Sequence, residues 1–335
     1  MPAEFISPEA FDLPDVTKAV DSSERALLRQ DLESIITKVD MKGTPLRKRF
    51  PRTQANGLTH EYTQRVSLGS PSSSFYADGQ LPNDGTTRYV RKGKQIKCLG
   101  EIGRVTGLMI AAGRSFADQL ALEQQARMVS VLQAEEDALL WGDATKPYSV
   151  THSDGSQSIQ HLEFDGLDRI IRQEDGIVYD AATHPGGSKV GIPLVNLVIQ
   201  LIYDNNGEPT CIVLGSREKR FFNELLHNFV RYGGDGIVHV ERQLGVSVMY
   251  YDSDFGSLPL IPTRYIKPDS SQKTKMFVLC EKTAGENIIE VAELQSIGSQ
   301  PLAKIDDSER FMINEYEALI NRAPQWNAVI DNLTA

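Results

Sequence analysis

The hydrophobic pattern divides the chain into parts that differ in how much apolar surface they could bury. Residues 1–20 contain three prolines and no helical period, which predicts an extended arm. Residues 21–40 then predict a short amphipathic helix, capped by Asp21 or Ser22, because apolar side chains recur at helical spacing at Leu28, Leu32, Ile35, Ile36 and Val39.

Large apolar residues are sparse between residues 41 and 100. The pattern predicts strands over 60–66 and 87–91, joined by a tip that is rich in serine and glycine. A two-stranded ribbon with polar faces is not stable alone in water. It is therefore either disordered or supported by another subunit, and four aromatic residues favour support: Tyr62, Phe75, Tyr76 and Tyr89. We accordingly expect residues 60–90 to add nothing to the chain's own core.

A long helix is predicted from Ser115 to Trp141, a stretch without glycine or proline. Ser115 and Asp118 are typical of a capping box, and Gly142 would supply a left-handed stop. The helix would be roughly 40 Å long, which suits a strut that packs on a sheet. Its polar face is expected to contain Gln124, Gln125, Arg127 and Glu135.

The remaining residues have the pattern of an ordinary α/β domain after a polar, turn-rich stretch at 145–160. The expected helices are 192–203 and 216–231. The expected strands are 210–214, 246–251, 275–280, 288–294, 309–319 and 324–330, the last two being strands or a strand and a short turn, with a flexible loop at 233–236.

The charge of the chain is unevenly distributed. The 335 residues have a net charge of −10, which argues against a dedicated nucleic-acid binder. Residues 41–104, however, contain twelve basic and four acidic side chains, whereas the rest of the chain is acidic. We expect the basic segment of one copy to lie on the acidic body of the next, since such complementarity sets orientation between partners.

Motifs for catalysis or metal binding are weak. Asp252 and Asp254 follow a predicted strand and could hold a divalent cation with a nucleotide sugar, but a polar turn explains them as well. Gly186–Lys189 lacks the spacing of a phosphate loop, and the six histidines lack zinc-protease spacing. We expect no catalytic residue, cofactor or metal. Cys98, Cys211 and Cys280 are expected to be buried free thiols of a protein made in a reducing cytoplasm, and no apolar run is long enough to span a membrane.

The order of these parts resembles the major capsid proteins of tailed bacteriophages, the Hong Kong 97 type of α+β fold. The stretch Glu135–Asp143 looks like the exit of that family's spine helix, and residues 311–324 look like its returning strands. The resemblance implies an N-terminal arm (1–45), an extended β-ribbon loop (46–100), a peripheral domain (101–165 and 300–335) with the spine helix (115–141), and an axial domain (166–299).

The resemblance also implies a function. Copies would form hexamers and pentamers of an icosahedral shell that encloses double-stranded DNA, assembled in the host cytoplasm with portal, scaffolding and possible decoration proteins and without a membrane. The extended loop of each copy would lie over its neighbour. The candidate residues for contact between subunits are the four aromatic residues above together with Arg47, Lys48, Arg49, Arg52, Arg88, Arg91, Lys92 and Lys94.

Three other functions stay open at this point. An encapsulin, the shell of a bacterial nanocompartment, would share the fold. A metal-dependent nucleotide-sugar transferase would use Asp252 and Asp254 in a pocket. A nucleic-acid adaptor would bind DNA through the basic residues of 41–104, which the overall negative charge disfavours.

Overall fold

The computed structural model describes residues 43–69, 75–81, 84–113, 118–151, 157–230 and 249–334. The expected N-terminal arm and amphipathic helix therefore lie outside the described residues, apart from 43–45. The same holds for the expected loop at 233–236 and for part of the ribbon tip. No helix of the described part is long and apolar enough to cross a membrane.

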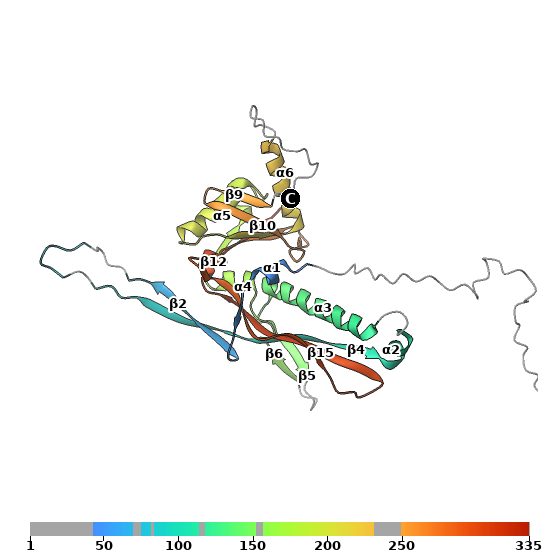
Figure 1. Cartoon of the computed structure of the whole chain (residues 1–335). Helices are drawn as coiled ribbons and strands as arrows, with labels where there is room; N and C mark the ends of the chain where they lie inside the picture. Colours follow the sequence, from blue (N-terminus) through green and yellow to red (C-terminus); the bar gives the residue numbers. More distant parts are fainter. Residues whose placement is uncertain are drawn as a thin grey trace, which may run out of the picture. The chain divides into compact units, whose positions relative to one another are not determined.

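One part of the fold has two layers, a four-stranded sheet and one long helix that lies on it (Figure 1). The strands lie in the order β1 (Arg52–Gln54), β14 (Ile289–Pro301), β15 (Ser308–Asn321) and β4 (Lys97–Thr106). Helix α3 (Gln119–Trp141) packs on this sheet by placing Val131 and Met128 against Phe311 and Ile313. The long strut on a sheet is thus confirmed.

Both ends of α3 differ from the sequence prediction. Asp118 is the N-cap itself, and its carboxylate accepts the N–H groups of Leu120 at 3.1 Å and Ala121 at 3.3 Å. At the other end, Gly142 has φ −51°, so the predicted left-handed stop is wrong. Glycine is required there for space, because a Cβ would meet the carbonyl oxygens of Phe164 at 2.4 Å and Ala138 at 2.7 Å.

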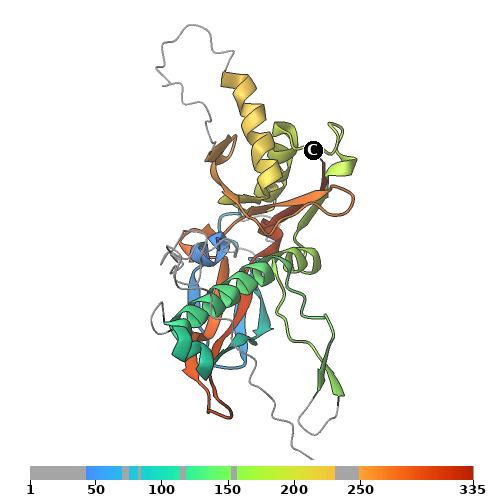
Figure 2. The same ribbon diagram turned by 90° about the vertical axis from the view of Figure 1, so that its right-hand side faces the viewer.

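A six-stranded sheet forms the core of the second part, and its central strands are buried on both faces (Figure 2). Its order is β7 (Ile177–Asp180), β16 (Ala328–Leu333), β11 (Thr274–Leu279), β8 (Cys211–Leu214), β10 (Gly256–Pro262) and β9 (Tyr250–Ser253). Successive side chains of β8 and β11 alternate between two apolar clusters. One cluster includes α5 (Ile192–Asp204) and α6 (Ser216–Val230), and the other includes α4 (Leu167–Gln173) and the end of α3.

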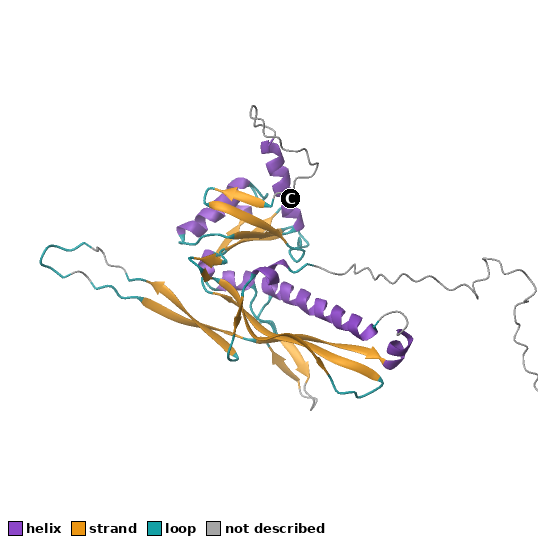
Figure 3. Ribbon diagram, viewed as in Figure 1, coloured by secondary structure: helices purple, strands orange, loops and turns teal. Residues whose placement is uncertain are grey.

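The predicted ribbon is present as the antiparallel pair β2 (Thr59–Ser67) and β3 (Arg88–Gln95), and Figure 3 shows it extending away from the sheets. Two shorter hairpins are β5 (Tyr148–Thr151) with β6 (Gln157–Gln160), and β12 (Lys282–Thr283) with β13 (Glu286–Asn287). The remaining helices are α1 (Pro45–Arg49), α2 (Gly107–Gly113), η2 (Ala181–Thr183) and η3 (Pro324–Trp326).

Sheet membership crosses the predicted domain limits at two strands. Strand β14 was placed almost wholly in the axial domain but pairs with β15, and β16 was placed in the peripheral domain but pairs with β11. The domain boundaries therefore stay a prediction. Among the three free cysteines, Cys211 and Cys280 are buried as expected, whereas Cys98 is exposed on β4, so its predicted burial is wrong.

Candidate functional site

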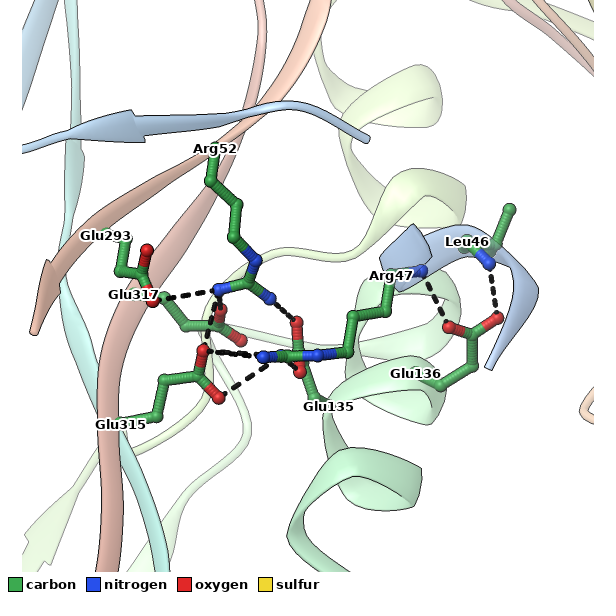
Figure 4. Close-up of polar contacts among 8 residues, drawn as sticks. All are labelled: Leu46, Arg47, Arg52, Glu135, Glu136, Glu293, Glu315 and Glu317. Atoms are coloured by element: carbon green, nitrogen blue, oxygen red, sulfur yellow. Dashed lines mark hydrogen bonds and ion pairs between the residues drawn. The ribbon is translucent and has the colours of Figure 1, made fainter. Parts of the chain in front are cut away.

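The candidate site is a cluster of two half-buried arginines and three fully buried glutamates (Figure 4). Arg47 on α1 and Arg52 on β1 reach the carboxylates of Glu135 on α3 and of Glu315 on β15. An Arg52 terminal nitrogen lies 2.6 Å from Glu315 Oε1 and 3.3 Å from Glu317 Oε2. The same terminal nitrogen of Arg52 also lies 3.2 Å from Oε1 of Glu293, a half-buried residue on β14. We call Arg47, Arg52, Glu135, Glu315 and Glu317 the charge cluster.

The charge cluster is short of one positive charge. Its three carboxylates are fully buried, and its two guanidinium groups neutralise only two of them. Burial, and then the charge of Glu315, raise the pKa of Glu317 to about 7, although Arg52 and Arg47 act in the opposite direction. One oxygen of Glu317 also has no hydrogen-bond donor among the described residues. The cluster therefore favours a proton on Glu317.

The same glutamates are the only group of three potential metal ligands in the described ranges. Their carboxylate oxygens lie within 4.8 Å of one another. The two guanidinium groups, however, already occupy the position of a cation there. A divalent ion would face their repulsion, so the donor set fits arginine better than a metal.

The side chain of Glu136 binds the backbone of the segment that carries Arg47. Its two carboxylate oxygens accept the N–H groups of Leu46 at 2.8 Å and Arg47 at 2.9 Å, which have no partner inside the short helix α1. Burial raises the pKa of Glu136, and these two hydrogen bonds only partly offset it. Because Leu46 and Phe50 are also buried in the core, residues 45–54 are held firmly against α3 and β15.

A second set of contacts anchors the base of the ribbon. Lys92 and Lys94 on β3 place their ammonium groups 2.8 Å and 2.6 Å from the two oxygens of Glu174, and Lys94 lies 3.4 Å from Asp165. Burial alone would raise the pKa of Glu174, but the two lysines lower it. We call Lys92, Lys94, Glu174 and Asp165 the ribbon anchor.

Tyr62 completes this attachment on β2. Its side chain is 4% exposed and packs with Ala55, Ala292 and Ile320. Its hydroxyl donates to the carbonyl oxygen of Asn321 at 3.1 Å, and the Arg322 guanidinium lies over its ring. The expectation that residues 60–90 add nothing to the chain's own core is therefore wrong at Tyr62.

The ribbon beyond its base presents apolar side chains to the outside. Phe75 is 94% exposed and Leu81 92%, and Val66, Leu68, Tyr76 and Tyr89 are also largely exposed. Among the polar side chains of this part, Arg88 is also exposed. Exposed aromatic and aliphatic groups on one projecting ribbon are typical of an interaction surface.

The twelve predicted contact residues thus fall into two groups. Six are engaged within the chain, although the basic ones were expected to pair with a neighbouring copy: Arg47, Arg49, Arg52, Lys92, Lys94 and Tyr62. The other six are exposed: Lys48, Arg88, Arg91, Phe75, Tyr76 and Tyr89. For Arg91 the exposed partner is Glu61 at 3.4 Å.

Asp252 and Asp254 lie at the tight β9–β10 hairpin, as the turn interpretation predicts. Asp252 is exposed on β9, and Asp254 accepts a long hydrogen bond of 3.4 Å from Asn196. They are not part of the group of potential metal ligands found in the described residues.

The sequence analysis did not identify the acidic partners in the charge cluster and in the ribbon anchor. Glu135 was expected on the polar face of the long helix but is fully buried. Two signals were present: the adjacent pair Glu135 and Glu136 one helical turn before Leu139 and Leu140, and the glutamates at alternate positions 315 and 317 of an apolar strand. Alternate residues of a strand share one face, so these carboxylates had to face the interior together.

Comparison with known proteins identifies the family. The family model described as SU10 major capsid protein matches residues 15–334. No curated protein matches the sequence.

Solved structures match the fold over nearly the whole chain. The capsid of cyanophage A-1(L) aligns with TM-score 0.67 and 12% identity, over 92% of this chain and 98% of that one. The Mycobacterium phage Bobi structure gives 0.61 and 11%, over 94% and 99%. The SrpI encapsulin of Synechococcus elongatus PCC 7942 gives 0.62 and 11%, over 95% and 96%. These likenesses confirm the Hong Kong 97 type of fold, which the encapsulin shares.

Proposed function

Because this chain belongs to the SU10 major capsid protein family, we propose that its copies form hexamers and pentamers that tile an icosahedral shell around double-stranded DNA. The family is one of structural virion proteins, so the chain is a capsid subunit and not an enzyme, and the transferase alternative is set aside. Capsid proteins act by assembling with copies of themselves. The hexamers, the pentamers and the DNA are parts of our proposal.

The exposed ribbon tip is the observation that supports this proposal. Its apolar side chains at Phe75 and Leu81 are more than nine-tenths exposed to solvent, whereas the ribbon base is fixed by Tyr62 and the ribbon anchor. A rigid base with an apolar tip fits a contact in which one copy reaches onto the next. A head-to-tail contact of this kind closes into a ring when its rotation divides the circle evenly.

The exposed basic residues of the ribbon are the remaining candidates for polar contacts with a neighbour. Arg88 and Arg91 lie on β3 outside the ribbon anchor and are exposed. The acidic body of an adjacent copy would attract them. Portal, scaffolding and decoration proteins, and assembly in the host cytoplasm, belong to the same proposal.

Electron microscopy of the purified chain tests the proposal directly. We expect rings or closed shells from the natural sequence. The double substitution Phe75→Ser and Leu81→Ser should prevent them, because it removes two apolar groups from the proposed contact. Since both side chains are more than nine-tenths exposed, the thermal unfolding midpoint of the subunit should stay the same.

A matched control is Ile159→Ser on the other projecting hairpin, where the side chain is 73% exposed. This variant should still assemble if the ribbon tip forms the contact. Normal shells from the Phe75 and Leu81 variant would contradict the proposal.

A further inference from the structure

Three hollows that share lining residues lie next to one another, and the middle one lies along the second half of helix α3; we call them together the groove. It consists of three hollows of about 330, 420 and 280 Å³. The first two share Arg264 in their walls, and the second and third share Trp141 and Lys267. In the middle hollow one wall is α3, and the opposite wall is the loop that follows β10.

The groove is positively charged although the chain carries a net charge of −10. Among the described residues, three acidic side chains line it: Asp137, Asp269 and Asp331. Six basic residues line it: Lys48, Arg172, Arg264, Lys267, Lys273 and Lys275. Such a concentration of one sign in a concave surface focuses the field on ligands of the other sign.

In the third hollow, two of the four basic side chains are available to a ligand. Arg172 is paired with Asp331 at 2.6 Å, and Lys275 with Asp168 at 3.1 Å. In contrast, Lys267 and Lys273 form no ion pair within 4 Å in the described part of the chain. The acidic group that senses Lys273 is Asp180, whose pKa is lowered by hydrogen bonds from Asn332 and Ala182 and also by the charge of this lysine.

The turn between these two lysines keeps them in place. The carboxylate of Asp269 accepts the N–H groups of Ser271 and Lys273, both at 2.8 Å. Asp269 is therefore occupied in holding the backbone of the turn that carries both lysines.

The walls favour an extended polyanion over a folded protein segment. On the α3 side the groove presents Ser130, Gln133 and Asp137, with only Trp141 as a large apolar side chain. An amphipathic helix would need a row of apolar contacts, which this wall lacks. Phosphate groups need only basic side chains and hydrogen-bond donors.

We propose that this groove binds the phosphate backbone of double-stranded DNA without sequence preference. The proposal rests on the proposed function, because a shell that encloses DNA brings its subunits into contact with phosphates. Two available lysines in each copy make a weak contact. Repeated over many copies, it would hold the outer layer of DNA while still letting it slide.

The test compares the full-length protein with the double variant Lys267→Gln and Lys273→Gln, using a short fluorescent DNA duplex. Fluorescence anisotropy over a salt series gives the affinity and its salt dependence. We expect the double variant to bind on the order of tenfold more weakly at low salt, with a slope of log K against log salt that is smaller by about two, one for each lysine.

The control is Lys282→Gln, an exposed lysine on the β12–β13 hairpin outside the groove, which should bind like the natural protein. A fluorescent polyglutamate peptide tests the rival acidic partner. The proposal is overturned if the natural protein does not bind DNA at low salt, if the double variant binds DNA as the natural protein does, or if polyglutamate binds more tightly than the duplex.

Electron microscopy of the same samples separates this inference from the capsid function. Shells from both proteins with equal DNA binding would remove the groove proposal alone. Absence of shells from the natural protein would count against the capsid assembly itself.

Discussion

Glu317 connects the stability of the subunit to pH. Its pKa is raised from 4.5 to about 7, so the folded chain holds a proton that the unfolded chain has already released between these values. The contribution of Glu317 to the free energy of unfolding should therefore be greatest below pH 4.5, and it should fall as the pH rises to about 7. In Glu317→Gln the side chain is neutral throughout, so this fall should disappear.

Thermal unfolding over a pH series measures this effect. Above pH 7 the Glu317→Gln variant should unfold at a higher temperature than the natural protein. Glu309→Gln on the same strand is the control, because its side chain is exposed and its loss should leave the pH profile as it is. An unchanged profile in the Glu317 variant would mean that the charge cluster is ionised throughout.

Arg52 allows a comparison of how much buried and exposed ion pairs contribute to the free energy of unfolding. Arg52→Met keeps much of the side-chain volume but leaves Glu135 and Glu315 with a single guanidinium. Removing one partner of a buried pair costs about 3–5 kcal/mol of unfolding free energy. Arg91→Met removes the exposed pair with Glu61 and should cost about 0–1 kcal/mol. Chemical denaturation should give these two values, and equal losses would argue against the buried cluster.

At the level of elements, the exit of α3 depends on a close approach of two backbones. A Cβ on Gly142 would meet the carbonyl oxygens of Phe164 and Ala138 below 3 Å. Gly142→Ala should therefore lower the unfolding free energy by about 1–3 kcal/mol through overpacking. Gly57→Ala, where only one atom lies near 4 Å, should change it little. Denaturant titration of both variants checks the difference.

The elements that could be predicted from the sequence are those whose secondary structure is determined by the local pattern of hydrophobic, glycine and proline residues. Helix α3 has its period and its glycine-free run, and β2 and β3 have their flanking turns. The burial of Glu315 and Glu317 could have been predicted from their alternate positions in an apolar strand. Their pairing with arginines could not, because Arg52, Glu135 and Glu315 are far apart in the sequence and only the fold brings them together. A charged side chain is normally exposed, so Glu135 was assigned to the polar face of the helix.

For the molecule as a whole, the structure separates what folds the subunit from what assembles it. Residues 45–54 and the ribbon base are fixed inside one chain by the charge cluster, the ribbon anchor and Tyr62. The ribbon tip contributes exposed side chains instead. Most basic side chains of residues 41–104 are therefore paired with carboxylates of the same chain. The apolar side chains of the ribbon tip, in contrast, are exposed and are the part that a neighbouring copy would cover.

This separation gives a prediction about replacing the tip. Ser67 pairs with Arg88 in the ribbon, so an Asn-Gly turn could join them in place of residues 68–87. The shortened chain should unfold at nearly the same temperature as the natural one, because the buried Tyr62 and the ribbon anchor remain. It should form no shells in electron microscopy, because the proposed contact is gone.

Tyr62→Ala is the opposite case. It keeps the tip but removes a buried aromatic side chain, which should cost about 3–5 kcal/mol of unfolding free energy. If the shortened chain lost as much stability as Tyr62→Ala, the tip would belong to the folded core of its own subunit. If the shortened chain still formed shells, the contact between copies would have to lie elsewhere. The exposed residues in the middle of β4, such as Ile102, would then be the next surface to test.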